Sequence, residues 1–203
     1  MKVIDIPTDQ RVLGKLFYEA IKSHHQLLYH NILDVGCGYG IAADYTCGLG
    51  EQMTLIDISR SAIDFQLNRW RHCNQVSIAC CTIHSINAFY DLIYYFLSFH
   101  HIIDITAELS KVRSLLTSDG ELIICEVSSA HNIPFHQNET VPYDGFTPTR
   151  LSEILKENGF CITQVNKLAV LHKNYSDYDI YMIKCTVDDI LQKQTVMNKK
   201  QFS

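Results

Sequence analysis

Residues 32–40, with the sequence I-L-D-V-G-C-G-Y-G, constrain the fold of this chain more than any other segment. The first part is short, apolar and rich in branched side chains, which is typical of a buried strand in a parallel sheet. Three alternating glycines follow, and a helix is expected to begin at Ile41. Glycine allows a sharp turn and lets a ligand approach the backbone N–H groups closely. The segment therefore predicts a strand, a tight turn and a helix, with a ligand site at the turn.

The spacing of the glycines separates two classes of nucleotide-binding protein. The fingerprint of nicotinamide dinucleotide sites is G-x-G-x-x-G, and its third glycine would fall on Ile41. A nicotinamide-dependent dehydrogenase is therefore disfavoured. One acid, Asp34, precedes the turn, and a second, Asp57, ends the next predicted strand. In a doubly wound sheet that strand end lies beside the turn, where an acid can accept both hydroxyls of a ribose.

Together these segments resemble the S-adenosylmethionine-dependent methyltransferases of the Rossmann-like class. Residues 34–40 match the first motif of that family, and Asp57 matches its ribose-binding acid. The resemblance continues in residues 89–96, which are similar to the fourth strand of the family, and in the L-S-F-H-H sequence that follows. The D-G dipeptide at residues 119–120 and the strand after it also match. A flavodoxin-like fold with a chance glycine turn is the alternative.

The resemblance implies S-adenosylmethionine as the cofactor and names the residues that would bind it. The three glycines would let the backbone approach the methionine end of the cofactor. Asp34 would hold the turn or accept from the cofactor ammonium through water, and Asp57 would bind the ribose diol. The full set of expected cofactor-binding residues is Asp34, Gly36, Cys37, Gly38, Gly40, Asp57, Ile58, Thr82, Ile83 and Phe96.

One feature of the family is missing from this sequence. An acid usually follows the third strand and accepts from the adenine amino group, but residues 80–85 are C-C-T-I-H-S. Thr82, His84 or a backbone carbonyl would have to supply the polar contact, and Ile83 would pack on the ring. The missing acid leaves open a second interpretation, a non-catalytic cofactor-binding or regulatory protein of the same fold.

A general base is needed only if the methyl acceptor must lose a proton. His100 is the candidate, because it follows the fourth strand at the carboxyl edge of the sheet. The equal alternative is a histidine that caps or packs against the next helix. The Asn/Asp-Pro-Pro-Tyr signature of amino-methyltransferases is absent, which argues against adenine N6 and glutamine amide acceptors. An aminopropyl transferase would need paired acids in this region, where only Asp91 and Asp104 occur.

The length of 203 residues suits one α/β domain. We predict a seven-stranded, mostly parallel, doubly wound sheet with helices on both faces and one antiparallel strand. The expected strands cover residues 31–35, 52–57, 75–81, 89–96, 121–127, 160–168 and 177–186, with a turn at 118–120. The expected helices cover residues 8–26, 41–49, 61–72, 105–116 and 148–158, and Ser59 is the predicted N-cap of the third.

Three segments outside this core receive separate predictions. Residues 1–29 would form a leading helical cover, in which Phe17 and Tyr18 either pack in the core, the favoured interpretation, or touch the ligand. Residues 128–147 are too long for an ordinary connection, and the resemblance makes them a substrate-covering insertion. Residues 192–203 are polar and are expected to form a frayed tail.

The net charge of the chain limits the class of molecule that could be its methyl acceptor. The net charge of −5 argues against tight nucleic-acid binding, which requires a concentrated basic face. A small-molecule acceptor is therefore expected, with a protein or RNA acceptor as the alternative. No run of 18 apolar residues occurs, and the first residues lack the apolar core of a signal peptide, so no membrane partner is expected.

Cysteines and histidines give little indication of a metal site. The eight cysteines form no C-x-x-C pair, which argues against a zinc site and fits a reducing cytoplasm. Adjacent histidines occur at residues 24–25 and 100–101. Because neighbouring side chains on regular structure point in different directions, neither pair is expected to chelate a metal. The sequence predicts no oligomeric state.

Overall fold

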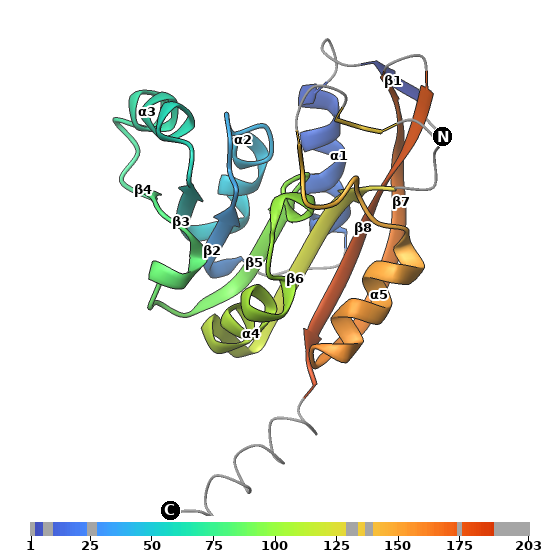
Figure 1. Cartoon of the computed structure of the whole chain (residues 1–203). Helices are drawn as coiled ribbons and strands as arrows, with labels where there is room; N and C mark the ends of the chain where they lie inside the picture. Colours follow the sequence, from blue (N-terminus) through green and yellow to red (C-terminus); the bar gives the residue numbers. More distant parts are fainter. Residues whose placement is uncertain are drawn as a thin grey trace, which may run out of the picture.

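The computed structural model describes residues 3–5, 10–23, 28–128, 134–136, 140–173 and 176–188. These residues form a single twisted sheet with helices on both faces (Figure 1). The predicted tail at 192–203 and the histidine pair at 24–25 lie outside the described residues. In the described part of the chain, no helix is long and apolar enough to cross a membrane.

The sheet has eight strands in the order β1-β7-β8-β6-β5-β2-β3-β4. All neighbouring pairs are parallel except those of β8, which runs antiparallel to both β6 and β7. The predicted fold class is thus confirmed. The strands are β1 Val3–Asp5, β2 Tyr29–Val35, β3 Gly50–Asp57, β4 Val76–Cys80, β5 Tyr90–Phe96, β6 Leu116–Val127, β7 Phe160–Lys173 and β8 Ser176–Val187.

Two details of the sheet differ from the sequence prediction. The three-residue strand β1 at the edge was not predicted, because it is too short to carry a periodic pattern. The turn predicted at residues 118–120 is wrong as a strand boundary, because β6 continues through it. The pairing of β6 with β5 shifts register between Tyr90 and Leu92 instead, so the extra residues form an irregularity inside the strand.

The helices cover the sheet in two groups. The helices are α1 Gln10–Lys22, α2 Ala43–Thr46, α3 Arg60–Arg69, α4 Ile105–Leu115 and α5 Pro148–Glu157, and the short 3-10 turns are η1 Cys47–Leu49, η2 Ile83–Ser85 and η3 Phe99–His101. Side chains of α1, α2 and α3 belong to one buried cluster, and those of α4 and α5 to another. The predicted N-cap of α3 is confirmed, since the Ser59 hydroxyl accepts from the N–H of Ala62.

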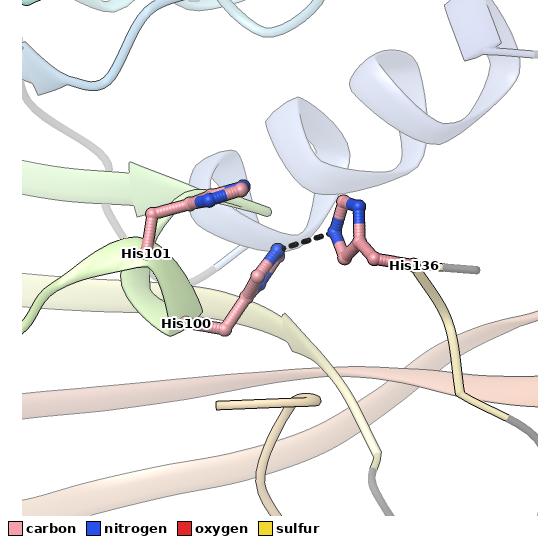
Figure 2. A group of neighbouring side chains, drawn as sticks. All are labelled: His100, His101 and His136. Atoms are coloured by element: carbon pink, nitrogen blue, oxygen red, sulfur yellow. Dashed lines mark hydrogen bonds between the residues drawn. The ribbon is translucent and has the colours of Figure 1, made fainter. Parts of the chain in front are cut away.

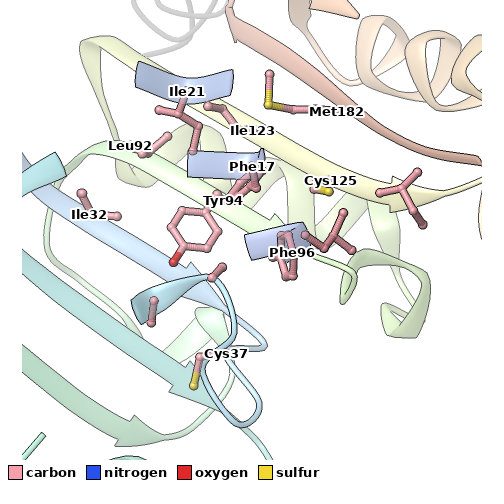
Figure 3. Close-up of a cluster of buried hydrophobic side chains, with 14 of the residues drawn as sticks. Phe17, Ile21, Ile32, Cys37, Leu92, Tyr94, Phe96, Ile123, Cys125 and Met182 are labelled. Carbon is pink, nitrogen blue, oxygen red and sulfur yellow. The ribbon is translucent and has the colours of Figure 1, made fainter. Parts of the chain in front are cut away.

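The central strand β5 divides the two buried clusters. Its alternate side chains Leu92, Tyr94 and Phe96 face α1, and Ile93 and Tyr95 face α4. Phe17 of α1 packs against Tyr94 and Phe96, with ring centroids 5.4 and 5.0 Å apart (Figure 3). Phe17 is fully buried, so the favoured interpretation of this residue as part of the core is confirmed.

The strand order reverses between β2 and β5. The chain proceeds from β2 outward to β3 and β4, and then returns to the other side of β2 as β5. In open parallel sheets this reversal opens a crevice at the carboxyl ends of the two strands, and ligands bind there. The glycine turn follows β2 directly, so the topology places it at this crevice.

Candidate active site

A cavity of about 630 Å³ lies at the carboxyl ends of β2, β3, β4 and β5. Each residue that the sequence analysis named as cofactor-binding lines this cavity. The fold therefore brings together residues that lie as far apart in sequence as Asp34 and Phe96. A cavity of this size is typical of sites that enclose a small organic ligand.

The glycine turn forms one wall of the cavity. Gly36, Gly38 and Gly40 have φ angles of 71°, 49° and 83°, a conformation that side chains disfavour. A Cβ atom on Gly36 would lie 2.6 Å from Ser98, and one on Gly40 only 2.4 Å from Gln66. A Cβ on Gly38 would meet no atom of the described residues within 4 Å. Two glycines therefore serve packing, whereas Gly38 leaves the cavity wall open.

Polar contacts from β3 and α3 fix the turn. The N–H of Gly38 donates to Asp57 Oδ2 at 2.8 Å, and the N–H of Ser59 donates to Oδ1 at 2.7 Å. The side chain of Gln66 donates to the carbonyl of Gly38 at 3.0 Å and accepts from the Trp70 indole at 3.0 Å. Gln66 is completely buried. Gln66 is not among the site residues predicted from the sequence, although a glutamine on the buried face of a helix is the available signal.

Asp34 is buried beneath the turn with one carboxylate oxygen unsatisfied. The hydroxyl of Tyr94 donates to Oδ2 at 2.8 Å, and Thr46 lies 2.8 Å from that same hydroxyl. Oδ1 has no hydrogen-bond partner among the described residues. Burial raises the pKa of Asp34 to about 7. The hydrogen bond from Tyr94 lowers this pKa, and the charge of Asp57 raises it further. A buried carboxylate oxygen without a hydrogen-bond donor fits a ligand that supplies such a donor, above all a cationic one.

Another part of the cavity lining comes from η2 and α4. Ile83 of η2 and Ile58, which follows β3, both line the cavity and contribute apolar side chains to it. Glu108 of α4 also lines it and accepts from the Tyr95 hydroxyl at 2.7 Å. Burial raises the pKa of Glu108, while Tyr95 and His84, 3.6 Å away, lower it. Thus a carboxylate from a distant helix lies in the region where the expected acid after β4 is missing.

His100, the candidate general base, does not line the cavity. It is buried in η3, with Nδ1 2.8 Å from Glu126 Oε1 and Nε2 2.9 Å from His136 Nε2. The neighbouring His101 lines the cavity instead. The sequence placed His100 at the correct edge of the sheet, but in the 3-10 turn His100 is buried against Glu126, whereas the adjacent His101 is exposed. The alternative that His100 caps the next helix is wrong, because Asp104 caps α4.

The predicted covering segments contribute little to this cavity. Among the described residues, neither α1 nor the segment 128–147 supplies a lining residue. Phe135 and Phe146 are buried in the two clusters beside the sheet, and Tyr143 stacks against Phe146 with ring centroids 4.9 Å apart. These aromatics serve packing, and the covering role of the segment stays a prediction.

Comparisons with known proteins agree with this architecture. Residues 33–122 match the family model described as a methyltransferase domain. An uncharacterised methyltransferase of Schizosaccharomyces pombe, C1347.09, is 23% identical over 147 residues, which cover 62% of this chain and 51% of that protein. The chain thus spans about half the length of that curated relative.

Solved structures with low sequence identity share the fold. The N-methyltransferase NodS from Bradyrhizobium japonicum WM9 is 17% identical with a TM-score of 0.68, over 90% of this chain and 98% of that one. The DhpI–SAH complex is 15% identical with a TM-score of 0.71, over 90% and 87%. The 1,6-didemethyltoxoflavin-N1-methyltransferase of Burkholderia thailandensis is 18% identical with a TM-score of 0.70, over 88% and 79%.

The family model covers the glycine turn, both acids and strands β3 to β5, and the solved structures share the strand arrangement around them. Residues 33–122 are therefore similar to a methyltransferase domain, and the chain shares the fold of the class I, Rossmann-like methyltransferases.

Proposed function

We propose that this chain transfers a methyl group from S-adenosylmethionine to a small-molecule acceptor. The observation that carries the proposal is the unsatisfied, buried oxygen of Asp34 beneath an open glycine turn. S-adenosylmethionine carries a protonated amino group and a positively charged sulfur. Either cation would compensate a buried carboxylate that has no other charged partner within the described residues.

The two acids would hold different parts of the cofactor. Asp34 would accept from the ammonium group, directly or through water. Asp57 would accept from the ribose hydroxyls, since each of its oxygens accepts one backbone N–H and retains a further lone pair. Gly38 would leave room for the cofactor, because a side chain at this position would project into the cavity.

Adenine recognition would depend on the wall formed by η2 and α4. Ile58 and Ile83 offer apolar surface for a flat ring. Thr82, His84 and Glu108 are polar residues of that wall, and any of them would replace the acid that is missing after β4. Glu108 was not among the adenine-contacting residues expected from the sequence, and its position in the cavity lining makes it a further candidate.

The cofactor supplies a methyl group that is already activated by the positive sulfur. The task of the protein is then to align the acceptor and exclude water. Phe96, Leu97 and His101 line the cavity at the end of β5, where the acceptor would enter. Leu97 has a φ angle of 53°, and such left-handed conformations of bulky residues concentrate at functional sites.

The preference for a small acceptor has two supports. The net charge of −5 would repel a phosphate-rich polymer. One of the structurally similar enzymes is a methyltransferase of 1,6-didemethyltoxoflavin, a small molecule. The described residues contain all eight cysteines and no disulfide between them, which favours a reducing compartment such as the cytoplasm.

A radiolabelled-methyl assay tests the proposal. A lysate is separated into small-molecule, protein and RNA fractions, and each is incubated with the chain and labelled S-adenosylmethionine. Label is expected in the small-molecule fraction with the wild-type chain and to be lost with Asp57→Ala. Label found only in protein or RNA would refute the small-molecule acceptor. Tight cofactor binding with no label in any fraction would favour the non-catalytic alternative.

A further inference from the structure

Three histidines converge beside the cavity. His100 and His101 come from η3, and His136 comes from the connection that follows β6 (Figure 2). Their ring centroids are 4.3, 4.9 and 5.2 Å apart. One ring nitrogen from each residue lies within 4.8 Å of the other two. The expectation that adjacent histidine side chains point in different directions is therefore wrong for residues 100–101, whose rings lie side by side.

A buried carboxylate fixes the orientation of the central histidine. Glu126 is completely buried, and its Oε1 lies 2.8 Å from Nδ1 of His100. The backbone N–H groups of Val127 and His100 also donate to this carboxylate, at 2.7 and 3.1 Å. Because a carboxylate accepts hydrogen bonds, Nδ1 of His100 carries the proton, and in the neutral ring Nε2 keeps its lone pair.

We propose that His100, His101 and His136 bind one divalent transition-metal ion, with Glu126 orienting His100 from outside the coordination sphere. Imidazole donors suit zinc, copper, nickel and iron, whereas magnesium and calcium prefer oxygen. The hydrogen bond from a ligating histidine to a carboxylate is the usual support of such sites. The negative charge of Glu126 also compensates part of the charge of the ion.

The distances are compatible with zinc after small side-chain movements. Zinc binds imidazole nitrogens at about 2.0–2.1 Å, so two ligands of a tetrahedral ion lie about 3.3 Å apart. The Nε2 atoms of His100 and His136 are 2.9 Å apart, and no pair of ligand atoms exceeds 4.8 Å. Rotation of the less buried rings of His101 and His136 would supply the remaining adjustment of at most about 1.5 Å.

The position of the cluster relates this ion to the cavity. His101 lines the cavity, so the ion would border it. Three protein ligands leave one tetrahedral position for another molecule, which is the arrangement of zinc sites that bind water or substrate. An acceptor with a nitrogen, oxygen or sulfur lone pair is the class of ligand that would fit this position.

The test measures zinc binding and needs no methyl transfer, so it is independent of the proposed function. A tag-free chain is titrated with zinc against a chromophoric chelator, and bound metal is counted by elemental analysis. We expect about one zinc ion per chain and an increase in Tm with zinc concentration. His101→Ala and His136→Ala should each weaken binding at least about tenfold, because each removes one ligand.

Two further variants separate ligand loss from general effects. His30→Ala is the matched control, since His30 lies at the opposite end of the strands, at the start of β2, and is exposed. It should bind zinc like the wild type. Glu126→Gln keeps the size of the side chain but removes the charge, and should weaken zinc binding about 10- to 100-fold. Circular dichroism without metal confirms that each variant is folded.

The proposal would be overturned if the wild type bound zinc no better than His101→Ala and His136→Ala. Absence of zinc binding by the wild type would also overturn it, and Glu126, His100 and His136 would then form a hydrogen-bonded chain without a metal.

Discussion

Asp34 and Asp57 end or nearly end neighbouring strands, yet their surroundings give them different chemistry. Asp34 is buried, with one oxygen satisfied by Tyr94 and the other unsatisfied. Asp57 is only partly buried and accepts from two backbone N–H groups. Burial and partner count therefore support the proposed roles, in which Asp34 would face a cationic group and Asp57 would accept from hydroxyl donors.

Replacement of Asp57 tests its proposed contact with the ribose. Asp57→Ala should weaken binding of S-adenosylhomocysteine by about 10- to 150-fold, because hydrogen bonds to a charged group contribute about 1.5–3 kcal/mol. Calorimetry measures the dissociation constant. The control is Asp64→Ala, an exposed acid of α3 that pairs with Arg60. Equal affinity in the two variants would remove Asp57 from the cofactor site.

Protonation of Asp34 should make cofactor binding depend on pH. Its pKa is about 7, and a cation beside it favours the ionised form. The affinity for S-adenosylhomocysteine should therefore increase as the pH rises from about 6 to about 7.5, by at most about tenfold per pH unit. Asp34→Asn should bind weakly and without this dependence. A wild-type affinity that is constant over this range would contradict the assignment.

The raised pKa of Asp34 also predicts a stability effect of definite sign. The folded chain holds the proton up to about pH 7, whereas the unfolded chain loses it near 3.8. Stability from this group is therefore present below pH 3.8 and is lost as the pH rises through about 7. Relative to Asp34→Asn, the free energy of unfolding of the wild type should decrease by up to about 4 kcal/mol between these two pH values. Denaturant unfolding at several pH values measures it; a difference between the two proteins that is independent of pH would contradict the prediction.

At the scale of elements, the glycine turn is held from several sides. The carbonyl of Ile56 in β3 accepts from the N–H groups of Gly36 and Cys37. Gln66 of α3 donates to Gly38. On the α1 side, a Cβ on Gly14 would lie 2.4 Å from the carbonyl oxygen of Ile41, so α1 packs directly on the backbone that leaves the turn.

Replacement of Gly14 tests this packing. Gly14→Ala would normally stabilise a helix by about 0.5–1 kcal/mol. Here the methyl group would contact a backbone carbonyl, so we expect a net loss of about 1–3 kcal/mol and weaker cofactor binding. Gly48→Ala is the control, since a Cβ there meets no described atom within 4 Å. If Gly14→Ala were as stable as Gly48→Ala, α1 would not constrain the turn.

Elements with a local pattern were predictable, and contacts between distant segments were not. The seven long strands follow from apolar runs, and the cavity position of Asp57 follows from the strand end beside the glycine turn. By contrast, nothing near residue 82 indicates Glu108, which reaches the cavity from α4. Nothing near residue 100 indicates His136, because residues 101–135 separate the two in sequence. The direction of the His100 ring depends on the 3-10 geometry of η3, which a sequence pattern does not specify.

At the scale of the whole molecule, the reversal of strand order between β2 and β5 brings these parts together. It places the glycine turn, Asp57, η2 and the end of β5 around one cavity. The histidine cluster borders that cavity through His101. Cofactor, acceptor and metal would therefore meet at one edge of the sheet, as the topology of an open parallel sheet favours.

Calorimetry of the unmodified chain with S-adenosylhomocysteine and with NADH tests the central claim most directly. The G-x-G-x-G turn, the unsatisfied oxygen of Asp34 and the acceptor Asp57 predict saturable binding of S-adenosylhomocysteine and no binding of NADH. Binding of NADH, with no heat from either S-adenosylhomocysteine or S-adenosylmethionine, would contradict the account.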